Sequence, residues 1–153
     1  MAGPKFDLSD SPGHLLRRAQ QYAFDLFSKE IGDSRLTPRQ FAVLLTVQQN
    51  EGLSQTDLVK RTGIDRSTLA DIVRRLVDRG LVMRKRTRHD ARMYALRLSD
   101  KGIATMREAA PAVNQTDERL LAALPQRDRD AFVKGLERMV EELSDTRETP
   151  KAD

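Results

Sequence analysis

The middle of this 153-residue sequence is rich in side chains that bind anions. Between Ser54 and Ser99 there are ten Arg and two Lys against five Asp and no Glu, a net charge of +7, whereas the whole chain carries only +4. The ends of the chain are therefore mildly acidic. A solvated surface usually mixes both signs, so this segregation favours a polyanionic partner such as nucleic acid.

The residues best suited to read a base sequence lie on the segment 66–79. Its apolar residues recur at three- and four-residue steps, which predicts a helix with one buried face. An α-helix fits the major groove of B-DNA, where each base pair shows a distinct pattern of donors and acceptors. An ordinary amphipathic surface helix is the alternative. The side chains expected to contact DNA are Arg66, Ser67, Thr68, Ala70, Arg74 and Arg75.

Two further groups of residues are suited to the DNA backbone and the minor groove. Ser54, Gln55 and Thr56 open a predicted helix, where hydroxyl and backbone N–H groups bind phosphate. Residues 81–86 and 94–98 alternate like two short strands, and the segment between them is strongly basic. We expect Arg92 to enter a minor groove, oriented by a carboxylate. The expected contacts of this hairpin are Arg86, Arg88, Asp90 and Arg92.

Start and stop signals place these groups on a defined set of elements. A helical pattern runs from Pro12 to Ile31, and Thr37-Pro38 starts a second helix. A helix from Ser54 to Arg61, a turn containing Gly63 and the helix that Asp65 caps form a helix-turn-helix. Ser99 caps a long helix that we expect to be interrupted or kinked at Pro111, and a last helix follows Pro125. The sequence therefore predicts a mainly α fold with a small β-hairpin wing.

Six segments occur in an order that is typical of one known family. On these residues, and less distinctly over the whole chain, the sequence resembles the MarR family (multiple antibiotic resistance regulators). The resemblance implies a homodimer whose terminal helices interlock while two winged domains read a palindrome, with Arg92 as the minor-groove residue. One departure is Ala91, where the family usually has a second Arg. The segments are Leu36–Phe41, Ser54–Leu58, Asp65–Leu69, Val73–Leu81, Asp90–Arg92 and Leu96–Gly102.

This architecture predicts a division of the chain into five parts. Long apolar stripes on the terminal helices exceed what so short a chain can cover internally, which independently favours a dimer. The expected parts are a flexible tail (1–11), an N-terminal dimerisation helix (12–35), the winged helix-turn-helix domain (36–99), C-terminal dimerisation helices (100–146) and a second tail (147–153).

A small-molecule effector is a further expectation from the resemblance. Residues 13–20 look like the first helix of family members that sense aromatic acids or their CoA thioesters, and such ligands commonly release DNA. Basic side chains here would attract a carboxylate or phosphates, and aromatic ones would line an apolar slot. The alternative is that the arginines are solvated or form dimer salt bridges and the aromatics are core. The candidate residues are His14, Arg17, Arg18, Tyr22, Phe24 and Phe41.

Several classes of protein are disfavoured by what the sequence lacks. It contains no Cys, so disulfides and thiol redox sensing are excluded. His14 and His89 have no second ligand at helical spacing, so neither a metal nor a cofactor is expected. No glycine-rich phosphate loop, nucleophile elbow or apolar membrane span occurs. We expect a cytoplasmic repressor that binds a palindromic operator; a ligand-independent winged-helix DNA-binding or protein-interaction module is the alternative.

Overall fold

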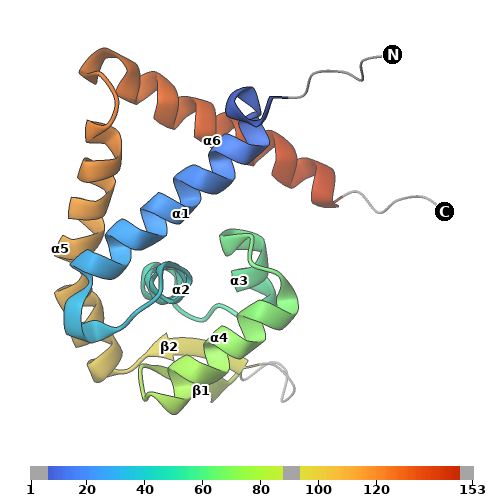
Figure 1. Ribbon diagram of the computed structural model, residues 1–153. Helices are drawn as coiled ribbons and strands as arrows, with labels where there is room; N and C mark the ends of the chain where they lie inside the picture. The colour runs from blue at the N-terminus through green and yellow to red at the C-terminus, as the bar shows by residue number, and fades with distance from the viewer. Residues whose placement is uncertain (1–6, 88–93, 149–153) are drawn as a thin grey trace.

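The computed structural model describes residues 7–87 and 94–148, and it confirms the predicted fold class (Figure 1). The chain is mostly helical and has one antiparallel hairpin, β1–β2. In order, the elements are η1 (Leu8–Asp10), α1 (Pro12–Glu30), η2 (Gly32–Ser34), α2 (Pro38–Gln49), α3 (Gln55–Thr62), α4 (Arg66–Asp78), β1 (Val82–Arg86), β2 (Tyr94–Leu98), α5 (Asp100–Ala122) and α6 (Gln126–Glu148).

The helices begin where the sequence places a capping side chain. Thr37 and Gln40 exchange hydrogen bonds in a capping box at α2, and Ser54 and Asp57 do the same at α3. Asp65 caps α4 by accepting a hydrogen bond from the backbone N–H of Thr68. These caps satisfy N–H groups that have no partner inside the helix. They fix the first residues of α3 and α4, which are the predicted DNA-contacting positions.

The core lies between α2, α3, α4, the hairpin and the N-terminal half of α5. Four residues of α4 are buried in it, as the periodicity predicts, whereas Val77 on the same face is only half-buried. In α2, Val43 is completely buried and Leu45 is half-buried. The buried residues of α4 are Leu69, Ile72, Val73 and Leu76.

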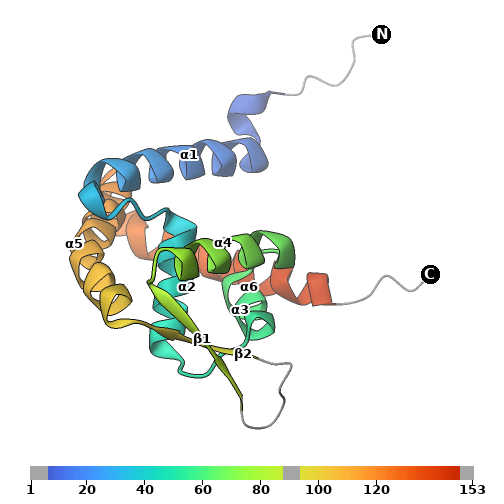
Figure 2. The ribbon, with the colours of Figure 1, turned by 90° about the horizontal axis from the view of Figure 1, so that it is seen from below.

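The hairpin is tied to the rest of the fold by backbone hydrogen bonds. Its register pairs Val82 with Leu98 and Arg86 with Tyr94. The N–H of Leu96 donates to the carbonyl of Leu53, ahead of α3, at 3.0 Å. Figure 2 shows the hairpin extending away from the helices on the side of α3 and α4. The strands therefore place their basic side chains next to the helix-turn-helix.

Three segments are more regular than the sequence suggested. The helix α5 continues through Pro111 without the expected interruption, and buried residues on both sides of the proline, Ala109 and Ala112, hold it in place. Tertiary packing here outweighs the local cost of a proline inside a helix. The expected tail 1–11 includes the short helix η1, which Asp7 caps by accepting from the N–H of Ser9. At the other end, α6 continues to Glu148.

The start of α5 lies directly against the end of α4. Ser99 accepts a hydrogen bond from the N–H of Gly102 at 2.9 Å and donates from Oγ to the carbonyl of Gly80. A Cβ atom on the buried Gly102 would lie 2.1 Å from the carbonyl oxygen of Leu81, closer than side chains approach backbone. Only glycine allows the two segments to pack this closely.

Replacing Gly102 with Ala should therefore destabilise the protein. Overpacking of this kind costs about 1–3 kcal/mol or more. Urea unfolding at fixed protein concentration would measure the loss. Gly13→Ala is the matched control, because a Cβ atom there meets nothing within 4 Å. Equal stability of the two variants would contradict the close contact.

Candidate nucleic-acid interface and ligand cavity

The exposed face of α4 presents the side chains that the sequence predicts for base contacts. Arg66, Ser67, Arg74 and Arg75 are exposed, and Thr68 and Ala70 are half-buried beside them. Because the opposite face is buried in the core, the helix cannot rotate to hide these groups. The structure thus brings the six predicted residues of this helix to one surface.

The first turn of α4 is held by a carboxylate. Asp65 accepts from the N–H of Thr68 at 3.0 Å and from the hydroxyl of Ser67 at 2.8 Å. These hydrogen bonds, those from Thr68 first, lower the pKa of Asp65 to about 2. The hydroxyl of Ser67 has its own lone pairs available for DNA, since it donates its proton to Asp65.

A second carboxylate lies among the arginines of α4. Asp71 accepts from Arg74 Nη2 at 2.6 Å and from Arg75 Nε at 2.8 Å. The hydrogen bond from Arg74 is the largest of the effects that lower the pKa of Asp71. Asp78 lies 3.7 Å from Arg74 on its other side. Asp71 was not among the residues expected to contact DNA.

The start of α3 offers less to a phosphate than its sequence suggests. Ser54 donates its hydroxyl to Asp57 at 2.8 Å, and its N–H donates to the same carboxylate at 3.0 Å. The N–H hydrogen bond is the main reason that the pKa of Asp57 is lowered. Thr56 is exposed and Gln55 is half-buried. Of the three predicted residues, Ser54 is therefore already engaged.

Besides Arg86, the strands of the hairpin present cations that were not among the expected DNA contacts. Arg86 is exposed and its guanidinium lies 5.9 Å from the centre of the Tyr94 ring, a cation–π contact. Arg84, Lys85 and Arg97 are exposed on the same hairpin. Their charge was the signal in the sequence, because strand alternation does not single them out: Arg84 and Lys85 are adjacent and both exposed. The predicted contacts Arg88, Asp90 and Arg92 lie outside the described residues.

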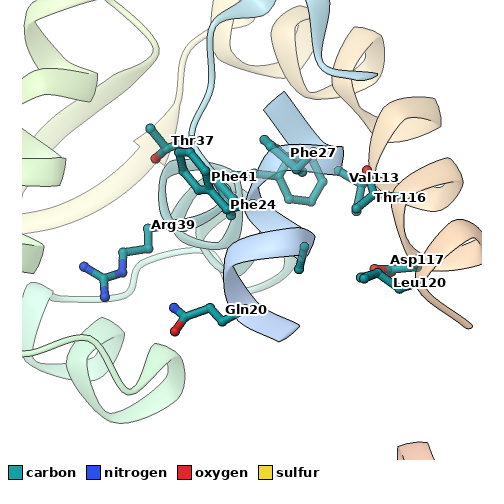
Figure 3. A pocket seen from close by; sticks show the side chains of 12 residues that line it. Gln20, Phe24, Phe27, Thr37, Arg39, Phe41, Val113, Thr116, Asp117 and Leu120 are labelled. Atoms are coloured by element: carbon teal, nitrogen blue, oxygen red, sulfur yellow. The ribbon is translucent and has the colours of Figure 1, made fainter. Parts of the chain in front are cut away.

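A cavity of about 490 Å³ lies between α1, α2 and α5 (Figure 3). Phe24, Phe27 and Phe41 form its apolar part, and the rings of Phe27 and Phe41 meet edge to face at 6.4 Å. Figure 3 shows Arg39 and Gln20 at one end and Asp117 at the other. Burial raises the pKa of the Asp117 carboxyl. The remaining lining residues are Ala23, Thr37, Pro38, Val113, Thr116 and Leu120.

The structure separates the six predicted effector residues into two groups. Phe24 and Phe41 line the cavity. The other four line a separate shallow hollow, where Arg17 contacts His14 Nδ1 at 3.3 Å and Arg18 donates to Tyr22 at 3.0 Å. Residues two apart on a helix point to nearly opposite sides, so Tyr22 and Phe24 cannot face one cavity. Arg39 and Asp117 were missed because they come from helices far apart in sequence.

Comparison with known proteins decides the family. A sequence model described as "MarR family" matches residues 36–93, a range that includes α2, α3, α4 and β1 and ends just before β2. The repressor NicR of Pseudomonas putida is 31% identical over 136 residues, covering 89% of this chain and 86% of NicR. The chain belongs to the MarR family. It is a winged helix-turn-helix transcriptional regulator and not an enzyme.

Solved structures of MarR-family relatives have the same fold. One is of BpsR from Bordetella bronchiseptica, described as regulated in its DNA binding by 6-hydroxynicotinic acid; it is 34% identical, with a TM-score of 0.83 and coverage of 90% of this chain and 97% of that one. The repressor CouR was solved bound to a 23-mer DNA duplex and to p-coumaroyl-CoA. Both CouR structures are 34% identical, with a TM-score of 0.81 and coverage of 92% and 99%.

Neither a metal site nor a membrane span is found in the described part of the chain. Residues 7–87 and 94–148 contain no group of three or more His, Cys, Asp or Glu placed to hold a metal ion. Within the same ranges, no helix combines the length and the apolar character that a membrane span requires.

The cap of α4 should make the stability of the protein depend on pH in the acid range. In the folded protein the pKa of Asp65 is about 2, below its ordinary value of 3.8. Its contribution to the free energy of unfolding is therefore fully present above about pH 4 and is lost as the pH falls toward 2. Asn caps helices as well as Asp but does not titrate. Urea unfolding of wild type and Asp65→Asn between about pH 5 and 2.5 should show a steeper loss for wild type. Parallel curves would contradict the assigned pKa.

Proposed function

We propose that this MarR-family regulator is a homodimeric repressor that binds a palindromic operator and is released by a small aromatic carboxylate. The observation that supports DNA binding most directly is the exposed arginine-bearing face of α4 beside a basic hairpin. Phosphate contacts position such a protein, and base contacts in the major groove provide specificity. Arg66, Ser67, Thr68 and Ala70 are at the end of the helix that enters the groove first.

The dimer is supported by apolar surface that the chain itself leaves exposed. Leu15 and Leu16 of α1 are exposed, and so are several large residues of α6, among which Val140 is 65% exposed. The helix α6 has no extensive packing partner among the described elements (Figure 1). Exposed apolar area of this extent marks a protein interface. A two-fold dimer would place two copies of α4 about one helical turn, ~34 Å, apart.

The effector site that we propose is the cavity between α1, α2 and α5. Its three phenylalanines suit an aromatic ring, and Arg39 suits a carboxylate, because it has no ion-pair partner among the described residues. Arg39 also lines a smaller hollow with Gly63 and Asp65, at the turn before α4. A ligand that engages Arg39 would therefore act next to the DNA-reading helix. The regulation of BpsR by an aromatic acid supports this class of ligand.

DNA binding is tested by its salt dependence. A protein that makes ~6 phosphate contacts should lose about a thousandfold in affinity between 50 and 200 mM salt, because binding releases counterions. Fluorescence anisotropy with a labelled duplex at several salt concentrations would measure the slope. The same titration with Arg107→Gln, a charge change on an exposed residue of α5, should leave the slope unchanged. A flat slope for wild type would contradict the proposal.

The ligand site is tested by Arg39→Gln. Thermal-shift titration with 4-hydroxybenzoate should stabilise wild type, by about 2.7 kcal/mol at a hundred times the dissociation constant, whereas 4-hydroxybenzamide should have little effect because it lacks the charge. The variant should lose the response and keep its affinity for DNA. Arg107→Gln should respond as wild type does. The assignment would be contradicted if 4-hydroxybenzoate stabilised Arg39→Gln as much as wild type, or if 4-hydroxybenzamide stabilised wild type as much as 4-hydroxybenzoate does.

A further inference from the structure

The one carboxylate that lies between the arginines of α4 has no part in the function proposed so far. Asp71 lies in the second turn of α4, opposite the buried face, and each of its oxygens has a different arginine partner. Oδ1 accepts from Arg74 Nη2 at 2.6 Å, and Oδ2 accepts from Arg75 Nε at 2.8 Å. The side chain of Asp71 is 46% exposed, so it too faces the surface that meets DNA.

The geometry of these two ion pairs leaves the outer donors of both arginines available. Arg75 is held through Nε, so its two Nη groups remain for a guanine or a phosphate. Arg74 is held through Nη2, and its Nη1 lies 3.7 Å from Asp78. A long arginine side chain loses conformational freedom when it binds, and fixing it beforehand reduces that cost. Asp71 therefore orients both arginines before DNA arrives.

The same carboxylate also opposes binding. Its negative charge faces the phosphates of any duplex and offsets part of the charge of Arg74 and Arg75. This penalty is the same for every sequence, but the benefit of oriented arginines exists only where acceptors lie in the matching positions. Asp71 thus weakens binding to every sequence, but it strengthens binding again only for sequences that place acceptors opposite the two arginines. The difference in affinity between those sequences and all others therefore increases.

We propose that Asp71 is a positioning residue that sets the sequence specificity of α4 by holding Arg74 and Arg75 in fixed orientations. The inference rests on the proposed DNA binding. It assigns Asp71 a role through the two arginines and not a direct contact with a base.

The test compares Asp71→Asn with Asp78→Asn. Both variants remove one negative charge near Arg74 on the exposed side of α4, but only Asp71 lies within hydrogen-bonding distance of both arginines. A preferred duplex is first selected from a random pool with wild type. Dissociation constants are then measured for this duplex and for a shuffled duplex of equal length, at the same salt concentration.

Asp71→Asn should bind the shuffled duplex more tightly than wild type does. The dissociation constant for the shuffled duplex, divided by that for the preferred duplex, should fall by about tenfold, the scale of one lost bidentate contact. Asp78→Asn should change both constants by a similar factor and leave the ratio intact. In an Arg74→Ala/Arg75→Ala background, Asp71→Asn should no longer change the ratio, since the groups it positions are gone.

Two results would overturn the inference while leaving DNA binding in place. One is an equal change of the ratio in Asp71→Asn and Asp78→Asn. The other is a loss of preference at one C·G pair alone when Asp71→Asn is also measured on single-base variants of the preferred duplex, which would indicate a direct contact with cytosine. If wild type itself selects no preferred duplex, the proposed function fails and the inference fails with it.

Discussion

The burial of one face of α4 is the constraint on which the rest of this structure depends. Leu69, Ile72, Val73 and Leu76 are almost completely removed from solvent. Burial of side chains of this size contributes about 1.5–3 kcal/mol each, or roughly 6–12 kcal/mol together, as an upper estimate. Exposed ion pairs on the other face contribute too little free energy to rotate the helix away from this arrangement. The core therefore decides the rotation of the helix, and the rotation decides which residues can meet DNA.

The neighbouring elements make that arrangement rigid at both ends of the helix. Asp65 holds the first turn, and the Gly80 carbonyl accepts from Ser99 just after the last turn. The hairpin and α5 follow from the same junction, where Gly102 packs against the backbone of Leu81. The reading helix, the wing and the long helix α5 thus form one packed unit, while α6 extends beyond it (Figure 1).

Local patterns predicted the elements, and failures began where distant segments meet. The caps at Thr37, Ser54 and Asp65 and the periodicity of α4 are properties of a few adjacent residues, so the sequence showed them directly. The continuity of α5 through Pro111 was not predicted, because it depends on packing against segments distant in sequence. The ion pairs of Asp71 were visible in principle, since residues three and four apart on a helix are neighbours.

The cavity could not have been assembled from sequence. Its residues come from three helices, and Arg39 and Asp117 have no motif that links them. The predicted effector residues mixed two faces of α1, because residue type was weighed without helical phase. Adding that phase would have placed Gln20, Phe24 and Phe27 together and left His14, Arg18 and Tyr22 on the other side.

In the proposed dimer, the exposed face of α4 occupies the major groove in two copies. Dimethyl sulfate reacts with guanine N7, an acceptor that lies in the major groove. Bound to its selected duplex, the protein should protect two clusters of guanines centred about 10 base pairs apart on one face of the DNA. Unchanged reactivity of every guanine in a duplex shown to be bound would contradict the account.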